Sequence, residues 1–435
     1  MKLPRSSSLL LVSLLLGTGC SSGFRYGFAS MTRPDPDYDA LDRRVQRTAS
    51  AGEATEAILW GEYRGPDGNG RVSGGALALS FGADGPPELW RVPLGPAYSS
   101  VVVGRGLVVT MEQQREREAV IALDRETGDL VWQHSWPARH YDSLSKAGPR
   151  ATPLLVDDRV VALGATGELV CVSVATGEPL WSRTLESDLE LDFGLSASPR
   201  RLGDAVLVAS ASGVALHALE DGALRWSTEL GEMAYVTPVF AEVDGARTIV
   251  VTTADRVVGL APEDGAERWS FPWEIGGLGA HCTQPMVLSG DRVVTSAGYG
   301  KGSQATRITN GEAEVLWRSP RFKTRFNEPI LLGDLLVGLD DGSLACVRAE
   351  DGKRLWKEGR YGYGQLLEVD GHLLVVGEDG RVVLVRFSPE APEELASFQA
   401  LEGGFPLNLP AFADGRLYVR SDLELACFDL TPVDG

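Results

Sequence analysis

The chain has 435 residues and a formal net charge of −19, and 43% of its residues are hydrophobic. The apolar content is sufficient for a large folded core and excludes disorder as a description of the whole chain. The acidic excess argues against a nucleic-acid partner, because phosphates would be repelled. With five Cys and five His, the sequence excludes a disulfide scaffold of this size and argues against a multi-histidine metal site.

Residues 1–19 have the features of a secretory signal: a basic start, an apolar run over residues 9–16 and then small residues. The run is about half of the roughly 20 residues that span a bilayer. Cys20 follows a Gly and resembles the lipidated Cys of a lipobox, which predicts a lipid anchor on the periplasmic side of a bacterial outer membrane. Lipoboxes usually carry Leu where this chain has Gly17, so a plain signal that leaves a periplasmic or secreted protein is the alternative.

Residues 20–57 show no sustained hydrophobic period and predict a flexible tether. Residues 58–84 predict an N-terminal docking segment, which contains the glycine-rich stretch 60–70. These glycines could cradle an anion, but no Lys-Ser/Thr pair follows them as in a P-loop. A turn that docks the N-terminus on the main domain is the favoured interpretation.

One pattern recurs through the rest of the chain: small-x-Asp-x-x-Thr-Gly-x-x-x-Trp, which is cleanest over residues 122–132. A shortened copy starts at Ala218 and ends at Trp226. The aromatic residues that close the repeats lie about 44 residues apart, a period typical of a four-stranded propeller blade. These residues are Trp90, Trp132, Trp181, Trp226, Trp269, Trp317, Trp356 and, by position, Phe398.

Each period also contains short β-branched runs separated by Gly-Asp or Asp-Gly turns, as a blade of antiparallel strands requires. The Thr-Gly turn supplies a positive φ, and we expect the Trp rings to pack between neighbouring blades as structural residues. The last repeat lacks its closing strand, and a lone closing strand precedes the first. Residues 85–435 therefore predict an all-β, eight-bladed propeller in which an N-terminal strand completes the C-terminal blade. Cys171, Cys346 and Cys427 take the small position of the repeat and are expected to be buried free thiols.

Over about residues 85–430 these repeats resemble those of the pyrroloquinoline-quinone-like (PQQ-like, quinoprotein-like) propeller family. The lipobox followed by eight blades is similar to the B lipoproteins of the outer-membrane β-barrel assembly machinery. The resemblance implies two possible activities. Dehydrogenases of the family hold PQQ and Ca²⁺ in the central funnel, often beside two adjacent bonded cysteines, whereas the assembly factors bind partners without catalysis. This chain has no Cys-Cys pair.

The connectors between blades end in a shared Pro, and polar residues near it are expected to surround the mouth of the channel. They are Arg150, Ser198, Thr237, Gln284, Asn327, Glu328, Gln365 and Asn408. A hydrogen-bonded, water-filled channel is favoured over a catalytic site. His140, Asp142 and Ser143 are adjacent in sequence only, which does not make a catalytic triad.

The same connectors carry aromatic and basic residues of the types enriched at interaction hot spots. They are Trp136, Arg139, His140, Tyr141, Tyr235, Trp273, His281, Arg325, Tyr361 and Tyr363. Arg321, Lys323 and Arg325 predict a local basic spot. Each aromatic residue could instead pin its own loop, but the set as a whole favours recognition.

The sequence therefore predicts a monomeric, non-catalytic envelope propeller that binds proteins or peptides and serves as a scaffold in outer-membrane protein assembly. No cofactor, metal or nucleic acid is expected. The alternative is a PQQ- and Ca²⁺-dependent dehydrogenase with Glu328 and Asn327 on the metal. A third hypothesis is a glycan-binding propeller that uses the funnel aromatics.

Overall fold

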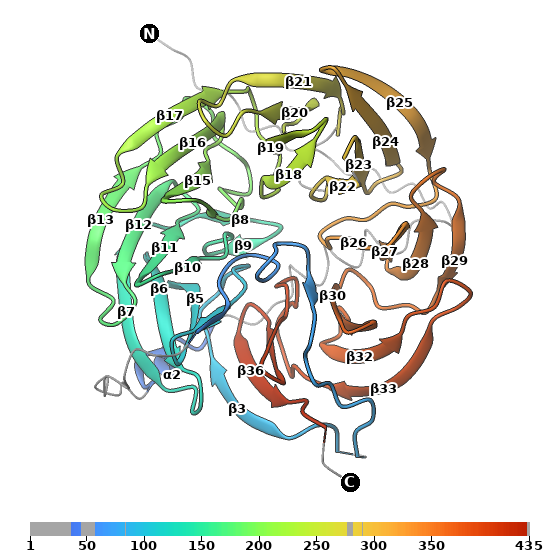
Figure 1. The fold of residues 1–435 in the computed structure, drawn as a ribbon. Coiled ribbons are helices and arrows are strands. Elements are labelled where there is room, and N and C mark those ends of the chain that lie inside the picture. The colour runs from blue at the N-terminus through green and yellow to red at the C-terminus, as the bar shows by residue number, and fades with distance from the viewer. Residues whose placement is uncertain (1–35, 45–56, 83, 276–281, 289, 433–435) are drawn as a thin grey trace, which may run out of the picture.

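The computed structural model describes residues 36–44, 57–82, 84–275, 282–288 and 290–432. Eight blades, each with four antiparallel strands, stand side by side around a central axis and close into a ring (Figure 1). The described residues contain one short helix, α2 (Tyr38–Asp42). Within these ranges no helix is both long enough and apolar enough to cross a bilayer. The predicted all-β, eight-bladed propeller is confirmed.

The first four blades follow one another along the chain. Blade 1 contains β4 (Val102–Gly104), β5 (Leu107–Gln114), β6 (Arg117–Asp124) and β7 (Leu130–Pro137). Blade 2 contains β10 (Leu154–Val156), β11 (Arg159–Leu163), β12 (Glu168–Ser173) and β13 (Pro179–Thr184). Blade 3 contains β14 (Arg200–Leu202), β15 (Ala205–Ala209), β16 (Gly213–Ala218) and β17 (Leu224–Glu229). Blade 4 contains β18 (Val239–Val243), β19 (Ala246–Thr252), β20 (Arg256–Leu260) and β21 (Glu267–Pro272).

The next three blades repeat this order, and the last is completed from the other end of the chain. Blade 5 contains β22 (Met286–Leu288), β23 (Arg292–Ala297), β24 (Gly302–Thr309) and β25 (Glu312–Ser319). Blade 6 contains β26 (Ile330–Leu332), β27 (Leu335–Asp340), β28 (Ser343–Arg348) and β29 (Arg354–Glu358). Blade 7 contains β30 (Gln365–Val369), β31 (His372–Val376), β32 (Arg381–Arg386) and β33 (Glu393–Gln399). Blade 8 contains β34 (Ala411–Ala413), β35 (Arg416–Arg420), β36 (Glu424–Asp429) and β3 (Glu88–Pro93).

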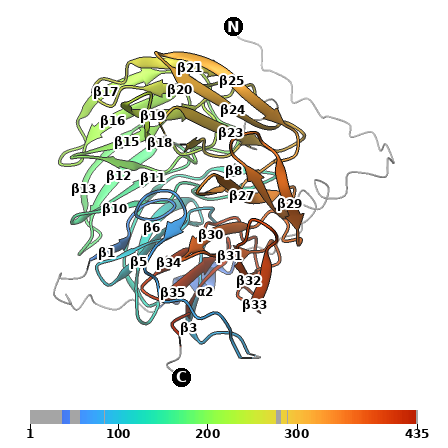
Figure 2. The same cartoon turned by 45° about the vertical axis from the view of Figure 1, so that its right-hand side comes forward.

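The pairing of β3 with β36 is antiparallel, with Trp90 opposite Cys427. The N-terminal strand therefore supplies the outer edge of the C-terminal blade, as predicted. Figure 2 shows the same closed ring obliquely, with β3 in the same blade as β34 and β35. The ring therefore leaves only short strand edges at its rim and its centre, which limits pairing with other chains.

At five of the eight blade junctions, the Trp of the outer strand docks on a glycine turn of the next blade. Trp132 Nε1 donates to Val174 O at 2.8 Å, and a Cβ on Gly177 would lie 2.6 Å from the Trp132 ring. Gly177 also has φ +72°, a value that favours glycine. The same two contacts recur between Trp90 and the turn of Gly128, Trp181 and that of Gly222, Trp226 and that of Gly265, and Trp317 and that of Gly352.

The small residue of each repeat lies opposite the Trp of its own blade. Cys171 faces Trp181, and Cys346 and Cys427 take the same position in their blades. These three thiols are free and buried, as predicted. Blade 3 corrects one expectation: its repeat is not shortened, because Leu216 rather than Ala218 lies opposite Trp226.

Replacing Gly177 with Ala should lower the free energy of unfolding by about 3 kcal/mol, because the new methyl group collides with Trp132 and disfavours the positive φ. Gly203→Ala is the matched control, since Gly203 has φ +64° but a methyl group there would have no atom within 4 Å. It should cost only about 1 kcal/mol. Urea denaturation measures both values, and equal losses would show that the Trp contact adds nothing.

Candidate functional site

The ring has two unlike faces. One face carries the connectors, which run from the outer strand of one blade to the inner strand of the next, and the turns between the second and third strands of each blade. We call this side the connector face. The opposite side, the turn face, carries the Thr-Gly turns and the turns that follow each inner strand. The predicted site residues fall into two sets, one on the connector face and one around the channel, and the two sets have different surroundings.

Around the channel, the residue before each shared Pro links its blade to the preceding one. Thr152 Oγ1 accepts the N–H of Ser100 at 3.0 Å, Ser198 Oγ accepts that of Thr152 at 3.0 Å, and Thr237 Oγ1 accepts that of Ser198 at 2.9 Å. All four residues are buried. Their polar atoms therefore join blades, which is a structural use of the predicted polar ring.

The larger polar residues continue the same links. Gln284 Nε2 donates to Thr237 O at 2.9 Å, and Gln284 N donates to Glu328 Oε2 at 2.6 Å. Gln365 Nε2 donates to the carbonyl of Phe326, and Asn408 Nδ2 donates to the carbonyl of Ser99 at 2.7 Å. These side chains are buried, so they are committed to the ring rather than exposed to a ligand.

The N-terminal segment 58–75, which we call the plug, lies across the channel on the turn-face side. Its strand β1 (Ile58–Trp60) pairs with β4 of blade 1, and its strand β2 (Arg71–Val72) pairs in parallel with β30 of blade 7. Figure 1 shows this blue segment crossing the centre of the ring. Between the two strands, Gly61 O accepts the N–H of Leu155 in blade 2 at 2.7 Å, and Glu62 pairs with Arg200 of blade 3 at 2.9 Å. The plug therefore ties blades on opposite sides of the channel together.

Arg64 is the deepest polar residue of the plug and is 5% exposed. Its guanidinium donates to Gln284 Oε1 at 3.2 Å in blade 5 and to Pro329 O at 2.8 Å in blade 6. It also donates to Asn69 O at 2.9 Å, which closes the glycine-rich turn on itself. Arg64 has φ +66°, so the backbone bends sharply where its side chain enters the centre of the ring, which we call the hub.

The plug also affects the ionisation of Glu328 in the hub. Burial raises the pKa of Glu328, and the positive charge of Arg64 partly opposes this shift. Tyr63 donates to Glu328 Oε1 at 3.4 Å, and burial raises the pKa of its phenol well above the usual range. The carboxylate oxygens of Glu328 therefore accept hydrogen bonds from Gln284 N and from the Tyr63 hydroxyl, and the Arg64 guanidinium acts on its charge.

These residues do not fit the PQQ and Ca²⁺ site that the fold family implies. Asn327 Oδ1 accepts the N–H of Leu339 at 3.1 Å, and Asn327 Nδ2 donates to Arg325 O at 2.7 Å. Glu328 is engaged as described, and the Arg64 guanidinium supplies the positive charge that a Ca²⁺ ion would bring. Within the described ranges, no three His, Cys, Asp or Glu side chains cluster in a way that could hold a metal ion.

The connector from blade 1 to blade 2 carries exposed apolar side chains. It contains a small hairpin of β8 (Tyr141–Asp142) and β9 (Lys146–Ala147), which Figure 1 shows lying toward the centre of the ring. Tyr141 is 56% exposed and Leu144 is 37% exposed, and Leu189 on the next connector is 42% exposed. We call these three residues, on two connectors that Arg150 joins, the apolar cluster.

Arg150 anchors this hairpin to the next connector. It is buried, pairs with Asp142 at 3.0 Å and donates to Phe193 O of the next connector at 3.0 Å. Burial would raise the pKa of Asp142, but the His140 ring at 3.8 Å, hydrogen bonds from Ser145 and the charge of Arg150 outweigh it and hold that pKa well below its usual range. Asp142 is therefore a charged anchor, and its neighbours His140 and Ser145 serve the hairpin's shape.

The other predicted site residues differ in how far they are buried. Trp136, Trp273, Tyr361 and Tyr363 are buried: Trp136 packs in the core of blades 1 and 2, and Tyr363 packs on Arg325 and Phe326. Arg139 is exposed, and Tyr235 is half-buried with its hydroxyl accepting the N–H of Phe193. His281 and the predicted lipidation site Cys20 lie outside the described residues.

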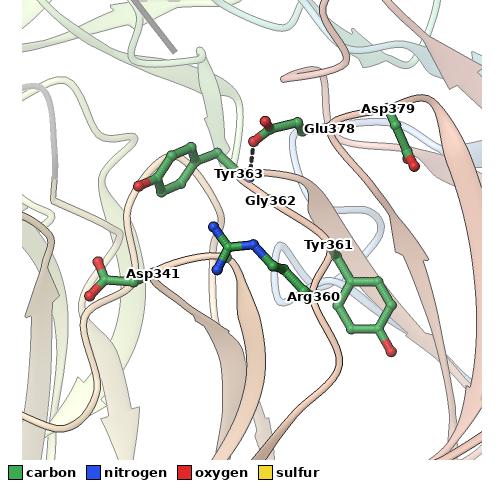
Figure 3. Close-up of a pocket in the computed structure, with 8 residues that line it drawn as sticks. Asp341, Arg360, Tyr361, Gly362, Tyr363, Glu378 and Asp379 are labelled. Carbon is green, nitrogen blue, oxygen red and sulfur yellow. Dashed lines mark hydrogen bonds between the residues drawn. The ribbon is translucent and has the colours of Figure 1, made fainter. Parts of the chain in front are cut away.

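A pocket of about 220 Å³ lies on the connector face between blades 6 and 7 (Figure 3). Its wall is formed by Asp341 and Gly342 of blade 6, by residues 360–363 of the connector and by Glu378 and Asp379 of blade 7. Figure 3 shows the Arg360 guanidinium on the side of Tyr363 and Asp341, while the Tyr361 ring points away. Glu378 accepts the N–H of Tyr363 at 2.9 Å.

Sequence reasoning missed the plug's specific partners and this pocket. The Arg-Gly-Pro-Asp-Gly stretch signalled a turn, but nothing in its spacing relates Arg64 to Gln284 or Glu62 to Arg200. Those pairs depend on where the segment crosses the ring, which is set by blade geometry rather than by local pattern.

Comparison with known proteins gives a consistent relationship. A family model described as outer membrane protein assembly factor BamB matches residues 72–229 and 116–358. The outer membrane protein assembly factor BamB of Burkholderia pseudomallei (strain K96243) is 26% identical over 267 residues, which are 58% of this chain and 65% of that protein. The chain therefore spans slightly less than two thirds of this relative's length.

Solved structures share the fold at low identity. BamB from Moraxella catarrhalis is 17% identical with a TM-score of 0.54, over 80% of this chain and 99% of the other. A europium-containing methanol dehydrogenase is 11% identical with a TM-score of 0.61, over 82% and 89%. Because the family model matches more than half of the residues, the chain belongs to the family of outer membrane protein assembly factor BamB.

Replacing Arg64 with Ala should loosen the plug without opening the ring, because Pro329 O and Gln284 Oε1 lose their buried donor. We expect a local loss of about 2 kcal/mol, which is roughly 30-fold faster hydrogen exchange in β1 and β2. Asp67→Ala removes a charge from the same segment at an exposed side chain without a salt bridge among the described residues, and it serves as the control. Equal exchange in the two variants would contradict the anchoring role of Arg64.

Proposed function

We propose that this member of the BamB family is a non-catalytic scaffold in outer-membrane protein assembly. In this proposal a lipid on Cys20 holds it at the periplasmic side of the outer membrane, and the connector face of blades 1 to 3 binds a protein partner. The exposed apolar cluster of Tyr141, Leu144 and Leu189 is the observation that carries the proposal.

The hub supports a binding role over a catalytic one. Its polar residues link blades, and Arg64 and Tyr63 of the plug fill the space beside Glu328. A reaction at this position would require the plug to leave, with loss of its contacts to blades 2, 3, 5 and 6. The dehydrogenase alternative has no comparable support, because its structural relatives share only the fold at this identity.

The surface chemistry defines the partner that fits. The connector around Leu189 carries Glu186, Asp188, Glu190 and Asp192, so acidic side chains surround the exposed apolar ones. Apolar residues in such a setting mark interaction sites when they gather, whereas single ones do not. A partner surface with apolar side chains flanked by Lys or Arg matches this part of the connector face.

Photo-crosslinking in the native envelope tests the proposal. With p-benzoylphenylalanine at Tyr141 or Leu189, we expect a crosslink to a component of the outer-membrane assembly machinery, identified by mass spectrometry. Leu224 on the outer strand β17 is 58% exposed and is the matched control position. Crosslinks of equal yield at Leu224, or none at Tyr141 and Leu189, would contradict the proposed face.

A further inference from the structure

We propose a second recognition site on the connector face, over blades 5 to 7, that binds carboxylate side chains of an acidic peptide segment through Arg325. This inference rests on the proposed function as a protein-binding scaffold and adds the chemistry of one ligand. It concerns a different part of the face from the apolar cluster of blades 1 to 3.

Arg325 lies in an aromatic sandwich. Its guanidinium carbon is 3.7 Å from the ring centre of Tyr363 and 4.2 Å from that of Tyr299, with Phe326 at 5.4 Å. Its stem packs on Gly298, where a Cβ would lie 2.7 Å from Arg325 Cδ. Both faces of the planar cation are therefore covered, and its orientation is fixed.

The edge of this guanidinium is not satisfied. Arg325 is 2% exposed, and its Nε and Nη2 have no hydrogen-bond acceptor within the described structure. Stacking on rings offsets part of the lost hydration but supplies no acceptor in the guanidinium plane. A carboxylate matches this edge, because two oxygens can accept from two N–H groups of one Arg.

Tyr299 covers one face of this guanidinium from the solvent side. It is 65% exposed and has φ +49°, an uncommon conformation for a bulky residue. It sits on the turn between β23 and β24, beside Gly298 and Gly300. A side-chain rotation of Tyr299 would expose the Arg325 guanidinium without moving a blade.

The surroundings favour an anion. Lys301, Arg321 and Arg360 lie on the same turn and connectors, and none of them forms a salt bridge within the described chain. Of the acids beside them, Asp341 pairs with Lys323 at 3.0 Å and Glu378 accepts the N–H of Tyr363, and Asp379 also lines the pocket. Lys301, Arg321 and Arg360 therefore remain outside salt bridges in a chain of net charge −19.

An acidic peptide fits better than an isolated small anion. Arg325 and Arg360 are on successive connectors, so a chain with spaced carboxylates can reach both. The pocket of about 220 Å³ beside Tyr363 offers room for a further side chain. Binding against the overall charge must come from this local cluster, since the protein as a whole repels acidic ligands.

The test uses the full chain and a fluorescein-labelled decapeptide of alternating Glu and Ser, with a Gln-Ser decapeptide as its neutral counterpart. Fluorescence polarisation should show the Glu peptide binding about tenfold more tightly than the Gln peptide. Arg325→Gln should weaken binding about tenfold, and Arg325→Lys should lose most of the affinity because Lys lacks the planar fork. Arg360→Gln, at an exposed position, should weaken binding about threefold.

Arg225→Gln on the outer strand β17 removes the same charge far from the site and should leave the affinity unchanged. Equal binding of the two peptides, or equal affinities of the Arg325→Gln and Arg225→Gln proteins, would overturn the proposal. If Arg325→Gln does not fold, as judged by its thermal melting, Arg325→Lys and Arg360→Gln decide the outcome. Absent peptide binding with intact crosslinking at Tyr141 refutes this inference alone, and the reverse result refutes only the proposed partner surface.

Discussion

The contact between an outer-strand Trp and the glycine turn of the next blade is the interaction on which the rest of the structure depends. At Trp132 the ring covers Gly177 and the indole N–H reaches Val174 O, and this geometry recurs at five of the eight blade junctions. The turn glycine must have a positive φ and must also lack a Cβ, so one residue type meets two independent demands. Repetition of this contact fixes the angle between sheets and therefore the number of blades that closes the ring.

Closure of the ring creates a channel, and the N-terminal plug fills one side of it. Arg64 and Glu62 bind to blades far apart in sequence, so the plug stabilises the ring by joining blades on opposite sides of its axis. The consequence for function is that polar residues such as Gln284 and Glu328 serve internal contacts. Recognition is left to the connector face, where Tyr141 and Leu189 are exposed.

The fold could be predicted from the sequence because the residues of each repeat form the glycine turn and the Trp contact between adjacent blades. The positions of Trp90, Cys427 and the closing strand followed from counting periods, and the structure confirms them. The sequence did not predict which connector residues are exposed, since Trp136 and Tyr141 look alike in sequence but differ in burial. It also gave no indication that Arg325 lies between Tyr299 and Tyr363, because that sandwich joins three segments that only the ring brings together.

If the chain itself fills the hub and the connector face does the binding, the protein should not take up PQQ. The decisive measurement is a titration of the purified full chain with PQQ in the presence of Ca²⁺, with the quinone absorption spectrum and the reduction of an electron-accepting dye as readouts. We expect an unchanged spectrum and no dye reduction with alcohol or sugar substrates. A shifted spectrum with dye reduction that is lost in Glu328→Gln would show that the hub binds the quinone.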